Sequence, residues 1–447
     1  MKSLILKSTI FIVVLFGAMS SATAQSVYTN YRPYDQDGLY VFETPKQETN
    51  WKGDVKVRLG GNFTQQYQHL SHSSKFFTDA NNDKVNDNLY NLAPGFNLAT
   101  ANLNIDVWLA DGVRMNLITY LSARHHNESW VKGGYIQFDK LPFLKSDLVD
   151  KVMENVTIRV GHNELNYGDA HYRRTDNGNA VYNPFVGNYV LDAFNTEIGG
   201  EVTYQKNGIL ADFAMTTGAI NGVITRPAKT TNDPDNSRKP AYIGKLGYDK
   251  QINDDLRLRV TGSVYTISST ARNVLYNGDR AGSRYYLVVE PASVGGTATN
   301  ATAQAWSGNI QPGFTDKVTA IMGNLFLKYK GIEFFGTYET AQGRSNAEKD
   351  ERTAGQLAGE LIYRFGSKEN FYVGGRYNKV DAQFLFSGAI KDVSATRVQG
   401  VLGWFVTKNM VAKLEYVNQD YSGDFPATDV RNGANFKGLM IEAAVGF

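Results

Sequence analysis

Residues 165–194 form a polar segment whose basic side chains could bind anions. The segment is rich in Tyr, Gly, Asn and Pro, a composition typical of a compact, ordered loop. Its basic side chains are His171, Arg173 and Arg174. A guanidinium group offers paired donors that match carboxylate or phosphate oxygens. We therefore expect these side chains to meet anionic solutes in an aqueous passage. The alternative is that they pair with nearby carboxylates or lipid phosphates.

A second polar segment has the oxygen spacing of a calcium loop. The candidate ligands stand at alternate positions and are Asp79, Asn81, Asp83, Val85 (through its carbonyl) and Asp87. Lys84 stands where such loops need glycine, and Tyr90 stands where they need a bidentate glutamate. The sequence therefore predicts a Ca²⁺ site or, more simply, an Asn/Asp-rich surface loop. No other cofactor is expected.

Histidines near carboxylates raise the question of catalysis. His125 and His126 lie close to Glu128, and His162 precedes Glu164 by two residues. No serine signature stands beside them, and the spacing does not fit a zinc site on a helix. We expect no catalytic residues and predict that the protein is not an enzyme.

Most of the chain after residue 54 alternates between apolar and polar residues. In the last stretch, apolar side chains occupy every second position, at Leu439, Ile441, Ala443, Val445 and Phe447. Successive side chains of a β-strand point to opposite faces, so this alternation predicts strands with one apolar and one polar face. A strand ending on a terminal phenylalanine is typical of outer-membrane barrels, and we interpret Phe447 as an outer-membrane assembly signal.

Turn residues divide the chain into about 16 strands, an even number with short turns on one side and long loops on the other, as outer-membrane barrels require. The predicted strands are 54–68, 96–110, 113–124, 130–138, 155–164, 195–206, 209–220, 241–251, 256–270, 318–329, 332–341, 354–365, 371–380, 396–406, 410–421 and 437–447. The long loops include 381–395, and Ser146 to Glu154 is expected to form a short helix. A hairpin arm at 284–289 would raise the count to 18. The fold class is an all-β, transmembrane antiparallel β-barrel with short periplasmic turns and long extracellular loops.

The N-terminus reads as a secretory signal peptide. Residues 1–24 combine Lys2 and Lys7, a short apolar run and a small-residue cleavage site. Without them the chain has 44 basic and 44 acidic residues, which gives no support for nucleic-acid binding. We predict a periplasmic or lumenal segment at 25–53 and a barrel at 54–447. There is no cysteine to form disulfides or a lipid anchor.

A barrel of this size leaves an aqueous channel. By the strand phase, its inward basic side chains include Arg58, Arg114, Arg159, Arg257 and Arg259. We therefore predict a porin in a Gram-negative outer membrane, in contact with lipid and lipopolysaccharide. It would allow passive diffusion of small hydrophilic or anionic solutes, with a slight anion preference. The alternative is a surface-exposed adhesin or receptor barrel without an open channel.

Residues 155–205 resemble a known family. Ile158–Gly161, Tyr167–Asp169, Asn183–Phe185 and Glu197–Gly199 make this stretch similar to the Bacteroidota porins related to the phosphate-selective porins O and P. The resemblance implies a passive porin with 16 strands that is often a homotrimer. In that family phosphate selectivity depends on lysines at the constriction, whereas 165–194 contains no lysine. General diffusion is therefore the function that we predict.

Overall fold

The computed structural model describes residues 31–46, 51–76, 82, 88–122, 129–220, 238–270, 272–277, 282–294, 297–298 and 307–447. The predicted signal peptide, all five predicted calcium ligands and the histidines at 125 and 126 lie outside these residues.

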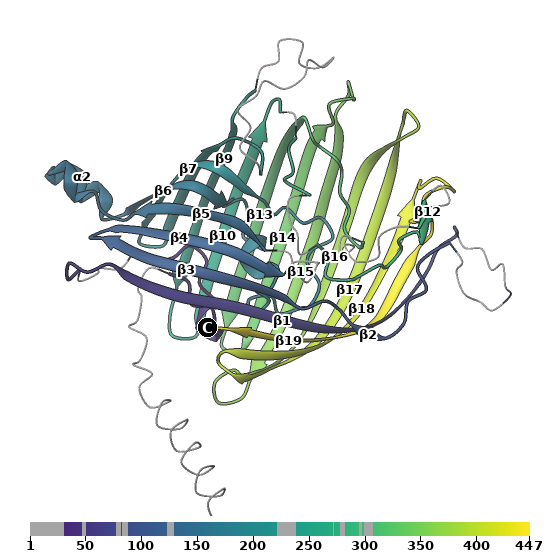
Figure 1. The fold of residues 1–447 in the computed structure, drawn as a ribbon, viewed down its shortest axis with the longest axis horizontal. Helices are drawn as coiled ribbons and strands as arrows, with labels where there is room; N and C mark the ends of the chain where they lie inside the picture. Colours follow the sequence, from purple (N-terminus) through teal and green to yellow (C-terminus); the bar gives the residue numbers. More distant parts are fainter. Residues whose placement is uncertain are drawn as a thin grey trace, which may run out of the picture.

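In the described part of the chain, sixteen long strands form one antiparallel sheet that closes on itself (Figure 1). The strands are β1 (Lys56–Ser73), β3 (Thr100–Ala110), β4 (Val113–Ser122), β5 (Trp130–Phe138), β6 (Val156–Glu164), β7 (Thr196–Lys206), β8 (Ile209–Thr216), β9 (Ala241–Gln251), β10 (Leu256–Ile267), β13 (Lys317–Tyr329), β14 (Ile332–Arg344), β15 (Arg352–Phe365), β16 (Phe371–Phe386), β17 (Ala389–Thr407), β18 (Met410–Gly423) and β19 (Asn435–Gly446). Each pairs with its neighbours in sequence, and β1 pairs with β19. The predicted barrel and its sixteen strands are confirmed.

Four shorter elements accompany the sixteen long strands. The two-residue strand β2 (Gly95–Phe96) pairs with β1, while β11 (Ser293–Val294) and β12 (Thr297–Ala298) form a small hairpin. Helix α2 (Asp147–Met153) follows β5 and stands apart from the wall (Figure 1). It confirms the short helix predicted between Ser146 and Glu154.

Two predicted loop features differ from the structure. The loop expected at 381–395 is instead a hairpin, because β16 and β17 stay paired as far as Phe386 and Ala389. The turn between them is Ser387–Gly388, and both residues have positive φ angles, as a two-residue hairpin turn requires. The segment 284–289 is no strand: Arg284, Leu287 and Val289 adopt positive φ angles, so the alternative count of 18 strands is wrong.

The outer surface of the barrel is apolar. Large side chains that point away from the lumen are strongly exposed, for example Leu246, Leu361 and Leu402. Near the short turns, four outward rings stack with nearly parallel planes, and their centroids are 5.7–5.8 Å apart: Tyr363, Phe365, Phe371 and Trp404. An apolar band edged by aromatic rings is the lipid-facing surface of a transmembrane barrel. Among the described residues, no helix is long and apolar enough to cross a membrane.

Phe447 takes part in closing the barrel. Its backbone N–H donates to the Gly61 carbonyl over 3.0 Å, and the Gly61 N–H donates to the Phe447 carbonyl over 2.9 Å. These bonds extend the pairing of β19 with β1 by one residue beyond Gly446. The terminal residue therefore lies at the seam, at the end of the barrel that carries the short turns. That end is periplasmic in barrels of this type.

Candidate functional site

The lumen is largely occupied by three segments of the chain itself. They are the N-terminal segment 31–46, the inner loop 165–195 that joins β6 to β7, and the described parts of the long connection between β10 and β13. Side chains on the inner face of the wall are consequently buried: Glu333, Glu360, Arg376 and Arg397 are at most 2% exposed. The wide aqueous lumen expected from the strand number is reduced to smaller spaces between these segments and the wall.

The inner loop folds into the barrel because wall side chains satisfy its backbone. The N–H groups of Asp169, Val186 and Val190 donate to side-chain oxygens of Asn324, Glu415 and Asn378 over 2.7–2.8 Å. Buried backbone donors must find partners, and here the polar face of the strands supplies them. The inner loop therefore lies inside the barrel.

The basic residues of the inner loop are held by carboxylates. Arg173, on a 3₁₀ turn at Ala170–Arg173, pairs with Glu333 and Glu360 and is 2% exposed. Arg174 is equally buried and pairs with Asp192 over 2.6 Å. Arg173 therefore ties the inner loop to strands β14 and β15, whereas Arg174 joins two parts of the inner loop to each other.

The other predicted pore-lining arginines divide into paired and stacked groups. Arg114 pairs with Asp139, Arg159 with Glu201 (3.1 Å), Arg257 with Asp249 (2.7 Å), and Arg259 with Asp169, Glu43 and Asp249. Arg58 is half-buried and its guanidinium lies 4.8 Å from the centre of the Tyr34 ring. The strand phase placed all five on the inner side of the wall, where most meet a carboxylate.

The N-terminal segment crosses the periplasmic end of the lumen and is anchored on several sides. The Tyr34 hydroxyl donates to Asp106 over 3.1 Å, and Lys408 pairs with Asp35 over 3.0 Å. At the far end of the segment, Lys46 donates to the carbonyls of Asp139, Met153 and Val156, beside the end of α2. Burial lowers the pKa of Lys46 to about 8.

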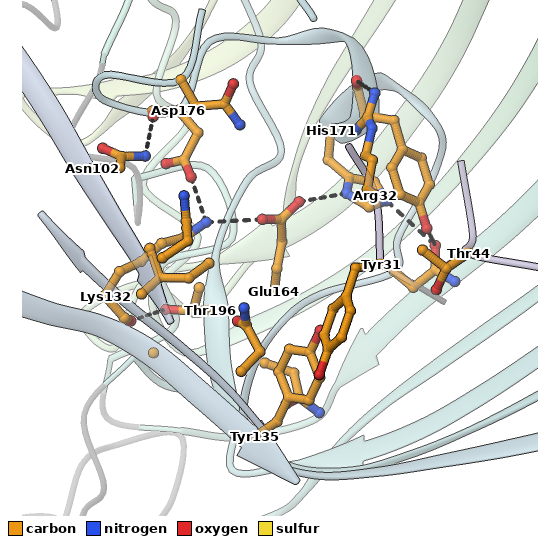
Figure 2. A pocket seen from close by; sticks show the side chains of 18 of the residues that line it. Tyr31, Arg32, Thr44, Asn102, Lys132, Tyr135, Glu164, His171, Asp176 and Thr196 are labelled. Carbon is orange, nitrogen blue, oxygen red and sulfur yellow. Dashed lines mark hydrogen bonds and ion pairs between the residues drawn. The ribbon is translucent and has the colours of Figure 1, made fainter. Parts of the chain in front are cut away.

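A mid-barrel cavity of about 200 Å³ lies between this segment, the inner loop and strands β3 to β7. Figure 2 shows its central network: the Lys132 ammonium lies 2.9 Å from Glu164 and 2.5 Å from Asp176, and Glu164 meets His171 over 2.8 Å. Burial lowers the pKa of His171. The hydrogen bond to Glu164 acts in the opposite direction but does not cancel this shift. The lowered pKa favours the neutral form of His171.

Lys132 reaches this cavity through a β-bulge. Ile118 pairs with Gly133 and Thr119 with Val131, so Lys132 has no partner on β4. An extra residue in one strand breaks the alternation and re-aims a side chain. Val131 therefore faces lipid and is 57% exposed, while Lys132 next to it is 5% exposed inside the barrel.

A second, periplasmic cavity of about 660 Å³ lies below the first. It is lined by the short turns around Asn155, Asn207 and Gly208 and by Asp249 and Arg257. Phe42 and Glu43 line both cavities. The two spaces thus follow one side of the wall and meet at these two residues of the N-terminal segment.

Phe42 and Glu43, which border both cavities, are fixed by the inner loop and the wall. The Phe42 ring lies 5.5 Å from Tyr172 and 5.4 Å from Phe326, with the Arg259 guanidinium 4.3 Å from its centre. Glu43 lies 2.9 Å from Lys245 and 2.7 Å from Arg259. Burial alone would raise the pKa of Glu43, but these two cations lower it to about 2.

Sequence reasoning did not single out Lys132, Glu43, Phe42 or the tyrosines and asparagines of the cavity. Lys132 was hidden by the bulge, since a regular strand counted back from Gln137 would direct it toward lipid. The adjacent glycines Gly133 and Gly134 are a usable signal, because an isolated break in a strand pattern often marks a bulge. Phe42 and Glu43 lie in a segment without alternation.

Comparisons with known proteins support the fold. No family model and no curated protein matches the sequence. Among solved structures, an anion-selective porin from Comamonas acidovorans has a TM-score of 0.50 and 10% identity, over 88% of this chain and 100% of that one. The outer membrane channel DcaP of Acinetobacter baumannii (TM-score 0.48, 11% identity) aligns over 89% of this chain and 99% of its own. OprB of Pseudomonas putida has a TM-score of 0.47 and 8% identity, over 88% of this chain and 94% of its own.

At such low identity the likeness is one of fold. Together with the apolar exterior, the closed sheet and the short periplasmic turns, it identifies the chain as a transmembrane β-barrel of the bacterial outer membrane.

Proposed function

We propose that the protein is a porin-like channel through which small hydrophilic solutes diffuse passively. The observation that carries the proposal is the pair of cavities along the wall from β3 to β10, which meet at Phe42 and Glu43. Both are lined by polar and charged side chains, which suits a path for hydrated solutes. The path is narrow because the inner loop and the N-terminal segment occupy the rest of the lumen.

Selectivity for anions is at most weak in this proposal. Most of the arginines predicted to attract anions pair with carboxylates, for example Arg174 with Asp192 at 2.6 Å and Arg159 with Glu201 at 3.1 Å. Paired charges present little net field to a passing ion. The relation to the porins O and P, and the homotrimer it implies, remain predictions from residues 155–205.

Recordings from the purified protein in a planar lipid bilayer test the channel. We expect discrete conductance steps in KCl that are absent when the same detergent solution carries heat-unfolded protein. A folded barrel that inserts without any steps would contradict the proposal and favour the adhesin or receptor barrel. Insertion can be checked separately, by flotation of the barrel with liposomes.

A further inference from the structure

We infer that the mid-barrel cavity is a binding subsite for a neutral polyhydroxylated solute of monosaccharide size. This inference rests on the proposed channel function, since it names the solute class that the path would take. Three properties of the cavity support it: its charges are internally compensated, its amides offer unused hydrogen-bonding capacity, and its tyrosine rings are held in place.

Charged side chains in the cavity lining already pair with side chains of opposite charge. Lys132 is shared by Glu164 and Asp176, and Glu43 is held by Lys245 and Arg259. An ionic solute would have to compete with these buried pairs and carry its own desolvation cost. A neutral solute avoids both costs.

Arg32 also lines the cavity, and among the described residues it forms no direct ion pair with a carboxylate, although Glu164 is near enough to act on its charge. Its guanidinium donates to the carbonyls of Gly38 (2.9 Å) and Tyr172 (3.0 Å) and lies 3.6 Å from the centre of the Tyr182 ring. Its donors thus fix the N-terminal segment to the inner loop. An anion at Arg32 is the rival occupant, and the experiment below includes it.

Amide side chains dominate the polar lining. They come from three strands and the inner loop: Asn102, Asn104, Asn116, Asn163, Asn166 and Asn179. Asn163 is 7% exposed, and its side-chain oxygen has no hydrogen-bond partner within the residues that the structure describes. A buried acceptor without a partner is costly, and a solute hydroxyl in the cavity would satisfy it. An amide suits a hydroxyl because it both donates and accepts.

Aromatic rings complete the lining. Tyr31, Tyr34, Tyr135, Tyr172 and Tyr182 all border the cavity. The hydroxyls of Tyr31, Tyr34 and Tyr172 donate to Val107, Asp106 and Asn166 over 3.1–3.2 Å, so these rings are fixed. A fixed ring presents an apolar face beside polar groups. The C–H faces and hydroxyl edges of a sugar have the same mixed character.

The test is saturation-transfer NMR on the intact protein in detergent micelles, with D-glucose, gluconate and glucosamine. These share a carbon skeleton and differ in charge. We expect transfer to glucose to exceed transfer to either ion. The Asn163→Leu variant should weaken glucose binding about fivefold, the loss expected for one neutral hydrogen bond. Asn418→Leu is the matched control, because Asn418 lies on β18 away from the cavity and should leave binding unchanged.

This experiment measures solute binding without ion flow. Its result therefore tests the subsite separately from the channel function. A stronger signal for gluconate would overturn the inference in favour of an anion subsite at Arg32. No signal for glucose, or the same signal in wild type and a folded Asn163→Leu variant, would overturn it as well. Folding of each variant is verified by its circular dichroism.

Discussion

Lys132 and Glu164 form an ion pair of 2.9 Å inside the barrel, although regular alternation along β5 would place Lys132 in lipid. The pair exists because the bulge at Lys132 turns its side chain inward, where Asp176 of the inner loop also receives it. One irregularity in a strand thus connects the wall to the loop that narrows the lumen. The ammonium is the counter-charge that Glu164 and Asp176 share, and it offsets one of their two negative charges.

Lys132→Met should make the channel more selective for cations, because Glu164 and Asp176 lose their shared counter-charge. The measurement is the reversal potential in a KCl gradient. The loss of stability should fall below the roughly 3–5 kcal/mol that breaking a fully buried pair costs, because the Glu164 side chain is 33% exposed. Adding Asp176→Asn should bring the reversal potential back toward wild type. An unchanged potential in the single variant would remove the cavity from the conduction path.

Phe42→Ala should raise the single-channel conductance. The ring borders both cavities and packs between Tyr172 and Phe326, so its removal should widen the passage proposed between them. Phe213→Ala is the control, since Phe213 lies on β8, is 54% exposed and faces lipid. Equal conductance in both variants would show that solutes do not pass at Phe42.

Acid should widen the same proposed passage. Glu43 has a pKa near 2 when the N-terminal segment is docked and an ordinary value of 4.5 when it is free. A carboxyl group with a lowered pKa stabilises docking above the free value, and this contribution is lost as the pH falls from 4.5 toward 2. Conductance should therefore rise over that window. Glu43→Gln should abolish that rise; if it persists in the variant, another group is responsible.

The wall of this protein could be predicted from the sequence more fully than the contents of its lumen. Period-two alternation and turns such as Asn207–Gly208 locate strands because both signals are local. The pairing of Arg173 with Glu333 joins residues 160 positions apart, and no local pattern encodes it. Likewise, the alternation along β10 predicts that Arg259 points inward, but it cannot predict the partners Asp169 and Glu43, which come from segments without alternation.

Arg173→Ala should destabilise the protein without a large change in ion selectivity. The substitution leaves Glu333 and Glu360 buried without their shared partner, at a cost of about 3–5 kcal/mol. Urea unfolding measures this cost. The control is Lys379→Ala, whose pair with Asp381 is exposed and should be worth about 0–1 kcal/mol. A selectivity change larger than that of Lys132→Met would instead show that Arg173 meets passing ions.

Gly446→Ala should release the N-terminal segment while leaving the wall closed. A Cβ at Gly446 would lie 1.9 Å from the carbonyl oxygen of Tyr34, so the backbone of that segment must move. The pairing of Gly446 with Asn62 uses backbone atoms and can persist. Hydrogen exchange should show faster exchange at 31–46 and unchanged exchange in β1.

The matched control for Gly446→Ala is Gly262→Ala on β10, where an added Cβ meets no atom within 4 Å. It should leave exchange at 31–46 unaltered. If the two variants exchange alike, contact with Gly446 does not hold the segment. If Gly446→Ala instead speeds exchange throughout β1, the glycine is needed for the pairing of β1 with β19. Release of 31–46 alone, with a rise in conductance like that of Phe42→Ala, would show that the segment is what closes the path.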